Sequence, residues 1–185
     1  MIDKVQAELT VSKIEHNELR YTGVDVKKVK DGIEIAMEDY VRSLNEIKEF
    51  RPAKKNDPLV ASELKVYRGY TGKLSWLAEN VRPDLSFTAL NMSKKGVSAV
   101  MSDLKQVNHS IRKAKERPSK IVFKNIVDSK EDLEVIGVGD ASYKWDDKSV
   151  GGNIVLLSNK TSKQMMPVFW KSKQIARSVH SSKDA

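Results

Sequence analysis

Hydrophobic periodicity changes twice along this chain, and these changes restrict the fold more than any other feature of its 185 residues. Strand and helix patterns alternate up to about Leu44, whereas from about Leu59 to Glu116 apolar residues recur every three or four positions. Beyond Pro118, alternating and β-branched stretches return. Alternation is typical of half-buried strands and the wider spacing of amphipathic helices. The sequence therefore predicts an α+β fold in three regions, 1–50, 51–118 and 119–185.

The first region predicts two strand segments and a helix. Glu18–Val26 alternates around Gly23, which is typical of a strand with a bend or a close backbone approach. The Asp31-Gly32 pair is a hairpin-turn signal, and Gly32–Ala36 alternates as the returning strand. Residues 37–48 then show helical spacing, so we expect a helix across them.

The second region predicts a three-helix bundle after a linker at Phe50–Pro58, which holds two prolines and no periodicity. Pro83 suits the first turn of the second helix, and Ser102 can cap the third. Tyr70 and Trp76 are expected in or beside the core, although an exposed aromatic there could stack on a base. The apolar face of the first helix is Leu64, Tyr67, Thr71, Leu74 and Ala78.

The third region predicts an antiparallel meander. Its strands are expected at 133–139, 152–157 and 167–170, with turns at Asp146–Lys148 and Ser158–Lys160. Ser181–Asp184 can begin a further helix.

Positive charge is concentrated in one stretch. The formal net charge is +8, and between Ser93 and Asn125 nine residues are basic while only Asp103 and Glu116 are acidic. Such a patch suits a phosphate backbone, and a lysine-rich solvated helix face is the alternative interpretation. The cations that we expect on the outer surface of the third helix or just after it are Lys105, Arg112, Lys113, Lys115 and Arg117.

Several classes of protein are disfavoured. The chain has no cysteine, which excludes disulfide scaffolds, cysteine-ligated metals and cysteine nucleophiles within it. No apolar stretch approaches the roughly 20 residues of a membrane span, and no secretory signal is visible. We therefore expect an intracellular protein, cytoplasmic or nuclear, with no membrane partner.

Asp140 is the main candidate for metal chemistry. It ends an apolar alternating segment beside small residues, where a carboxylate could bind a divalent cation. The alternative is a carboxylate that accepts local backbone hydrogen bonds at a strand-to-turn transition. The three histidines are scattered without ligand spacing.

Three ordered segments resemble the copia-type retrotransposon polymerases. The most specific is Tyr67–Ala78 followed by Arg82-Pro83-Asp84, which resembles a signature downstream of the polymerase active site in that family. Tyr21–Val26 resembles an earlier segment. Val138–Ser142, with Trp170–Gln174 after it, resembles the start of the ribonuclease H domain.

This resemblance implies the end of a polymerase palm at 1–50, a helical thumb or connection at 51–118, and a truncated ribonuclease H-like domain at 119–185. It implies that Tyr21, Thr22 and Gly23 lie near the primer terminus. The basic helical region would bind the backbone of a DNA or RNA template–primer or of an RNA–DNA hybrid. Asp140 would be the first catalytic ligand of Mg²⁺ in the parent enzyme.

The family's Tyr-x-Asp-Asp motif and its later nuclease carboxylates are not among these residues. Two-metal catalysis needs several carboxylates, so we expect no stable Mg²⁺ site and no polymerase or nuclease activity from this chain alone. The alternative function is a non-catalytic, sequence-independent nucleic-acid-binding or interaction module derived from a retroelement. An open ribonuclease H-like sheet would also allow self-association.

Overall fold

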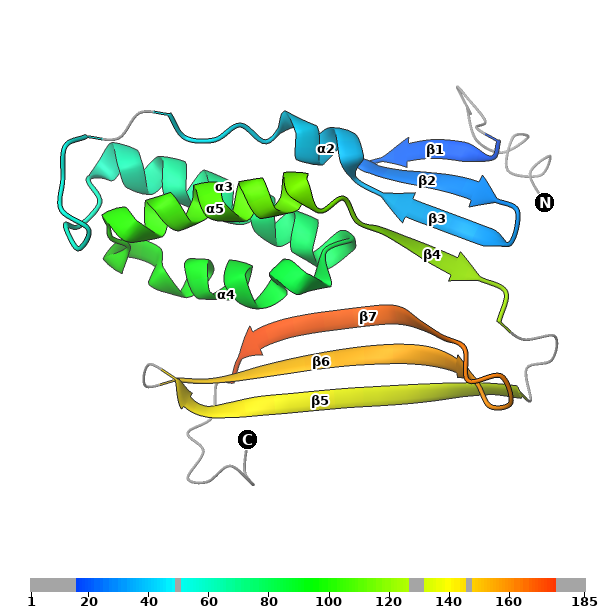
Figure 1. The fold of residues 1–185 in the computed structure, drawn as a ribbon. Helices are drawn as coiled ribbons and strands as arrows, with labels where there is room; N and C mark the ends of the chain where they lie inside the picture. The colour runs from blue at the N-terminus through cyan, green and yellow to red at the C-terminus, as the bar shows by residue number, and fades with distance from the viewer. Residues whose placement is uncertain (1–15, 49–50, 127–131, 146–147, 176–185) are drawn as a thin grey trace, which may run out of the picture.

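The protein has an α+β fold made of two antiparallel sheets and a block of helices (Figure 1). The computed structural model describes residues 16–48, 51–126, 132–145 and 148–175. One sheet has the strand order β1-β2-β3-β4 and the other β5-β6-β7. Figure 1 shows the first sheet at one end of the helical block and the second sheet along its side.

The first sheet begins with a hairpin where the sequence predicts a single bent strand. β1 (Glu18–Tyr21) and β2 (Val24–Val29) pair antiparallel, and Thr22 and Gly23 between them have φ angles of 50° and 87°. Two successive residues with positive φ are typical of the tight turn that matches the twist of paired strands. The prediction of one continuous strand was therefore wrong at this point.

The second hairpin is confirmed, with β3 (Gly32–Ala36) returning beside β2. A Cβ atom at Gly32 would collide with the carbonyl oxygen of Phe123. Phe123 belongs to β4 (Lys120–Lys124), which pairs with β3. The sequence predicts Lys120–Lys124 as part of the third region, whereas this segment completes the first sheet. Glycine is therefore needed at position 32 because the two backbones approach so closely.

α2 (Glu38–Ser43) is shorter than the predicted helix at 37–48. Leu44 has extended backbone angles and a buried side chain. The Asn108 amide binds both backbone groups of Ile47, accepting from its N–H and donating to its carbonyl, each at 2.8 Å. These bonds hold the chain extended at the point where helical spacing alone would continue the helix.

The helical block confirms the three predicted helices. They are α3 (Ala61–Asn80), α4 (Ser86–Lys95) and α5 (Met101–Glu116), and a 3₁₀ turn at Pro83–Leu85 precedes α4. Ser102 is not the N-cap of α5, because this helix already begins at Met101. Instead, the Asp103 carboxylate accepts the N–H of Val100 at 2.9 Å, and Glu63 accepts that of Val60 in the same way.

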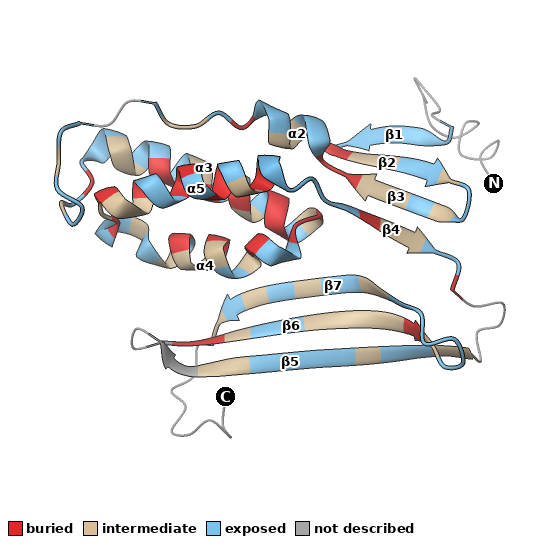
Figure 2. Cartoon of the chain, viewed as in Figure 1, coloured by how far each residue is buried: buried red, intermediate tan, exposed pale blue. Residues whose placement is uncertain are grey.

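The first sheet and the helices share one hydrophobic core. Val24, Met37 and Leu44 from the first region are buried in the same cluster as the inner faces of the helices, whereas none of the second-sheet residues whose burial is described belongs to it (Figure 2). The predicted face of α3 is correct, with Tyr67, Thr71, Leu74 and Ala78 buried and Leu64 partly buried. The remaining large members of the cluster are Leu59, Leu77, Val81, Leu85, Met92, Met101, Leu104, Val107 and Ile111.

The second sheet is the predicted antiparallel meander. Its strands are β5 (Leu133–Trp145), β6 (Lys148–Asn159) and β7 (Met165–Gln174), all longer than the sequence predicts. The Trp170 indole N–H donates to the carbonyl of Ala78 at 2.8 Å, which links β7 to α3. The turn predicted at Asp146 and Asp147 and the helix start at Ser181–Asp184 lie outside the described residues. No helix in the described part of the chain has the length and apolar character of a membrane span.

Candidate nucleic-acid interface

The basic residues that the sequence predicts on and after α5 are partly neutralised by carboxylates from elsewhere in the chain. Arg112 lies 2.6 Å from the Glu46 carboxylate, and Lys113 lies 3.4 Å from that of Asp84. We call the predicted set Lys105, Arg112, Lys113, Lys115 and Arg117 the α5 basic cluster. Of this cluster, Lys105, Lys115 and Arg117 are exposed and make no ion pair with another described residue.

Arg82 joins the ends of α3 and α5 from a buried position. Its side chain is 3% exposed and makes two hydrogen bonds to the Asp84 carboxylate, at 2.8 and 3.0 Å. It also donates to the carbonyl of Ala114, near the end of α5, at 3.0 Å. The hydrogen bond from Arg82 lowers the pKa of Asp84, with a smaller contribution from Lys113. The Arg-Pro-Asp motif therefore fixes how the two helices end beside each other.

The exposed side of α3 carries cations, glycines and an aromatic ring together. Lys65, Gly69, Gly72 and Trp76 follow one another at steps of three and four residues, so they form one stripe on the helix. Arg68 and Lys73 flank this stripe and are also exposed. We call these six residues the α3 outer face, whose members are Lys65, Arg68, Gly69, Gly72, Lys73 and Trp76.

The cations of the α3 outer face are available to a partner. No described carboxylate lies within ion-pair distance of Lys65, Arg68 or Lys73. The Lys73 ammonium lies 4.8 Å from the centre of the Tyr70 ring, a cation–π contact that leaves its charge uncompensated. These three charges therefore contrast with Arg112 and Lys113, which already have acidic partners.

The two glycines of this face have no packing reason within the described chain. A Cβ atom added at Gly69 or at Gly72 would meet no other atom within 4 Å. Glycine inside a helix is destabilising by about 0.5–1 kcal/mol relative to alanine, and alanine would fit at both positions. Because Gly69 and Gly72 have no side chains, the helix backbone at these two residues is open to close approach from outside. We call this part of α3 the open strip. Trp76, which is 38% exposed, borders this open strip.

The turn at Tyr21, Thr22 and Gly23 is joined to α3 through Tyr40 of α2. A Cβ atom at Gly23 would be 3.6 Å from the Tyr40 ring, and the Tyr40 hydroxyl donates to the carbonyl of Lys73 at 3.2 Å. The Tyr21 side chain is 70% exposed. Tyr40 thus connects the turn of the hairpin to the α3 outer face.

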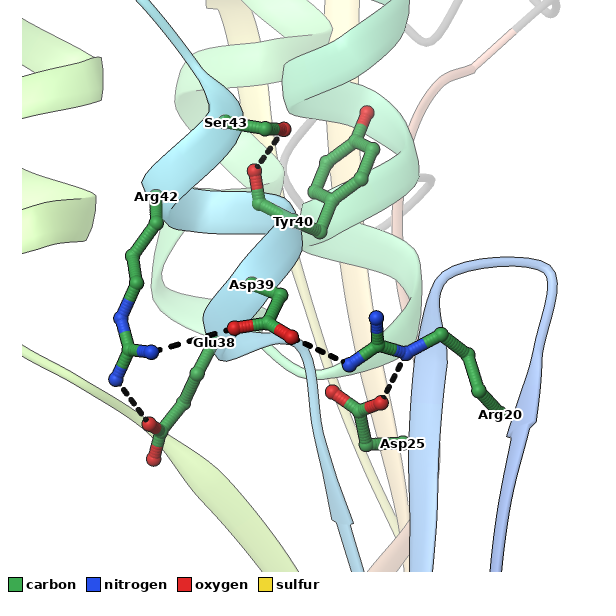
Figure 3. Close-up of polar contacts among 7 residues, drawn as sticks. All are labelled: Arg20, Asp25, Glu38, Asp39, Tyr40, Arg42 and Ser43. Carbon is green, nitrogen blue, oxygen red and sulfur yellow. Dashed lines mark hydrogen bonds and ion pairs between the residues drawn. The ribbon is translucent and has the colours of Figure 1, made fainter.

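A chain of ion pairs holds this hairpin against α2. Figure 3 shows the Asp39 carboxylate between two guanidinium groups, 2.6 Å from Arg20 and 3.2 Å from Arg42. Arg20 also binds Asp25 on β2, and Arg42 binds Glu38 at 3.0 Å. The hydrogen bond from Arg20 lowers the pKa of Asp39. Because the network is exposed to solvent, its main effect is to orient β1 and β2 rather than to stabilise the fold.

Asp140 stands apart from this interface, on β5. It lies within this strand and pairs with Gly152, so its predicted place at a strand end was wrong. It is exposed, and its carboxylate accepts the backbone N–H of Ala141 at 2.8 Å, a local hydrogen bond of the kind that the alternative interpretation expects. The shallow hollow beside it is also lined by Lys171 and Lys173. No group of three metal-ligating side chains occurs among the described residues. One carboxylate next to two cations does not fit Mg²⁺, which is bound through several oxygen ligands.

Sequence reasoning overlooked most of the α3 outer face. It places Trp76 in or beside the core, with stacking on a base as the alternative, and gives no role to Gly69 or Gly72. The available signal was their spacing, because two glycines on the polar side of a strongly periodic helix lower its stability without an evident structural need. The dense basic residues indicate α5 instead, because the carboxylates that pair with Arg112 and Lys113 are distant in the sequence.

Comparison of the chain with protein-family models, with curated proteins and with solved structures finds no match. The resemblance to copia-type polymerases therefore depends on the sequence motifs alone. Its most specific segment, Tyr67–Ala78, lies within α3 and includes Gly72, Lys73 and Trp76 of the α3 outer face.

Proposed function

We propose that this chain binds the backbone of a nucleic-acid duplex through the α3 outer face and the adjoining Tyr21–Gly23 turn. The observation that supports this most is found on one exposed side of α3. There Lys65, Arg68 and Lys73 have no acidic partner among the described residues, and no described residue packs against the two glycines. Each cation that neutralises a phosphate releases a counterion, which favours binding without regard to base sequence.

The glycines and the tryptophan suit the same partner. Without side chains at Gly69 and Gly72, a sugar–phosphate backbone can approach the helix closely. An exposed aromatic such as Trp76 can stack on a base or pack on a sugar, and such stacking tolerates any sequence. An acidic protein partner would pair with the cations but would give no use to the open helix backbone between them.

The motif resemblance supports a more specific version of this proposal. In it, the chain is part of a retrotransposon Pol polyprotein, with a palm end, a thumb or connection and the start of a ribonuclease H-like domain. The α3 outer face would then hold the template–primer or an RNA–DNA hybrid for an RNA-directed DNA polymerase. This chain alone would be inactive, because Mg²⁺ in the parent enzyme would need carboxylates that it does not supply.

The alternative is a retroelement-derived module that binds nucleic acid, or another partner, without belonging to an active enzyme. The first version predicts binding of duplex backbone, as does the second where its partner is nucleic acid, and neither assigns catalysis to these residues. A magnesium-dependent cleavage assay on an RNA–DNA hybrid tests whether the chain is itself an enzyme. Turnover by the 185-residue chain would contradict both versions.

Salt-dependent binding tests the site itself. The affinity for a labelled RNA–DNA hybrid is measured by fluorescence anisotropy across a range of salt concentrations. The triple variant Lys65→Gln, Arg68→Gln and Lys73→Gln should flatten the slope of log affinity against log salt by about 2–3 units, roughly 0.9 for each lost phosphate contact.

The matched control removes the same charge elsewhere. Its substitutions are Lys28→Gln, Lys30→Gln and Lys163→Gln, all at exposed positions away from α3. The control should keep the slope of the unmodified protein. Equal slopes for the two triple variants would mean that binding reflects net charge only, and the proposed site would then be wrong.

A further inference from the structure

The two sheets protect their outer edges differently. β1, at the edge of the first sheet, has only four residues and carries Glu18 and Arg20. β5, at the edge of the second, runs for 13 residues. Its regular part, Leu133–Ser142, contains no lysine, arginine or proline, and the register irregularity begins only at Ser142. Short length, charge, proline and bulges are the features that normally keep an edge strand from pairing with another chain.

The middle of β5 is uncharged and open to solvent. Val135–Gly139 contains five uncharged residues, and Val135 and Val138 are 67% and 52% exposed. No described side chain on this strand is buried (Figure 2). Alternate residues of an edge strand direct N–H and C=O groups away from the sheet, and a further strand can satisfy them.

We infer that β5 pairs antiparallel with β5 of a second copy of this chain, about a two-fold axis beside Val138. A second copy supplies a strand of the same length with the same uncharged centre, so no charge is desolvated at the middle of the ladder. The pairing joins two three-stranded sheets into one of six strands. It is independent of the proposed nucleic-acid site, which lies on α3.

Charge and regularity select this register. An axis at Gly137 would place Glu134 directly opposite Asp140 of the second copy, and like charges in that position are destabilising. An axis at Gly139 would extend the ladder beyond Ser142, where the strand is irregular. With the axis at Val138, Glu134 lies opposite Ser142 and Val135 opposite Ala141. All the paired residues then lie in the regular part of β5.

Because the chain has no cysteine, a single introduced thiol tests this register. Directly opposite residues of antiparallel strands have Cα atoms about 4.5–5.5 Å apart, within the range of a disulfide. Val138→Cys should therefore give a disulfide-linked dimer under mild oxidation. Val135→Cys is the matched control, since its counterpart in the second copy lies six residues along the strand, about 20 Å away. Equal cross-linking of the two variants, or none in either, would overturn the inference.

A second measurement needs no new bond. The molecular mass of the unmodified protein is followed by light scattering at increasing concentration, without nucleic acid, and should rise from monomer to dimer. Val138→Lys should abolish the rise because it places a charge at the centre of the edge, whereas Val97→Lys, at an exposed site between α4 and α5, should not. Circular dichroism confirms that both variants fold. A monomer at all concentrations, or an unlimited aggregate, would contradict a two-fold dimer.

Discussion

Helices α3 and α5 pack together and both carry basic side chains, but they use those charges differently. On α5, Arg112 and Lys113 bind carboxylates of the same chain. On α3, Lys65, Arg68 and Lys73 have no carboxylate partner among the described residues. Lys105 and Lys115 on α5, and Arg117 just after it, are exposed and also lack an ion-pair partner among the described residues. The α5 basic cluster therefore has more basic residues than α3 without leaving more of them free for a partner. The number of basic residues indicates how well a surface can bind phosphate only after the cations that are already paired with carboxylates have been subtracted.

Because of this difference, we expect some charges of the helices to affect mainly the stability of the fold and others mainly the affinity for nucleic acid. Arg82 is buried and holds the ends of α3 and α5 together, so its removal should be visible mainly in unfolding. Charges on α3 contribute little to packing, so their removal should be visible mainly in affinity. The following predictions test this separation.

The largest expected effect is on folding. Arg82→Met should lower the free energy of unfolding by about 2–4 kcal/mol, because it removes a buried cation that binds Asp84 and leaves the carbonyl of Ala114 without its donor. Urea unfolding monitored by circular dichroism measures this. Arg112→Met is the control, and loss of its exposed ion pair should change stability by about 0–1 kcal/mol. Similar losses in both variants would mean that Arg82 does not link the two helices.

The second prediction compares the two helices in binding. Lys65→Gln with Arg68→Gln should weaken duplex binding at about 0.1 M salt by one to two orders of magnitude, as expected for two lost phosphate contacts. Arg112→Gln with Lys113→Gln removes the same charge from α5 and should weaken it by less than about threefold, because these cations already have partners. Anisotropy titrations measure both. If the double variant of Arg112 and Lys113 weakens binding more, the binding site would be the α5 basic cluster and not the α3 outer face.

The third prediction separates stability from binding at one residue. Gly72→Ala should raise the free energy of unfolding by about 0.5–1 kcal/mol, because alanine favours the helix and meets no neighbour. Gly72→Leu should also fold, but its side chain should block close approach and weaken duplex binding. Gln106→Leu, on the exposed side of α5, adds a comparable side chain and should leave affinity unchanged. Unchanged binding by Gly72→Leu would show that the open strip on α3 has no role.

Much of the fold follows from local patterns in the sequence. The buried side of α3, the hairpin at Asp31-Gly32 and the meander of β5–β7 are all confirmed, since each depends on periodicity or turn chemistry within a few residues. The errors came from contacts distant in sequence. Asn108 ends the helical path near Ile47, 61 residues away. β4 pairs with β3 because of their approach at Gly32, which no local pattern reveals.

The candidate site was harder to predict from the sequence for the same reason. The cations were visible, but Glu46 and Asp84, which neutralise Arg112 and Lys113, could not be placed beside them without the fold. The Tyr21–Gly23 turn was identified only through the resemblance, and its position next to Lys73 depends on Tyr40. Gly69 and Gly72 became informative only once the structure showed that no described residue packs against them.

The smallest expected effect is a pH dependence of stability at the junction of the two helices. The hydrogen bond from Arg82 lowers the folded-state pKa of Asp84 below its ordinary value of 3.8. The unfolded chain therefore binds a proton at Asp84 more readily than the folded protein does. It follows that the stabilising contribution is complete above this value and is lost as the pH falls through the folded-state pKa.

Asp84→Asn removes the titrating carboxylate and tests this contribution. The difference in unfolding free energy between the unmodified protein and Asp84→Asn should be constant at neutral pH and should shrink below about pH 4. Urea titrations at a series of pH values measure it. Asp57→Asn, in the linker before α3, provides a control at a carboxylate that makes no ion pair with another described residue. A difference for Asp84→Asn that persists at low pH would mean that Asp84 acts through its shape and hydrogen bonds rather than through its charge. Arg82 would then hold the ends of α3 and α5 together through hydrogen bonds alone. The charge of its partner Asp84 would contribute nothing to stability.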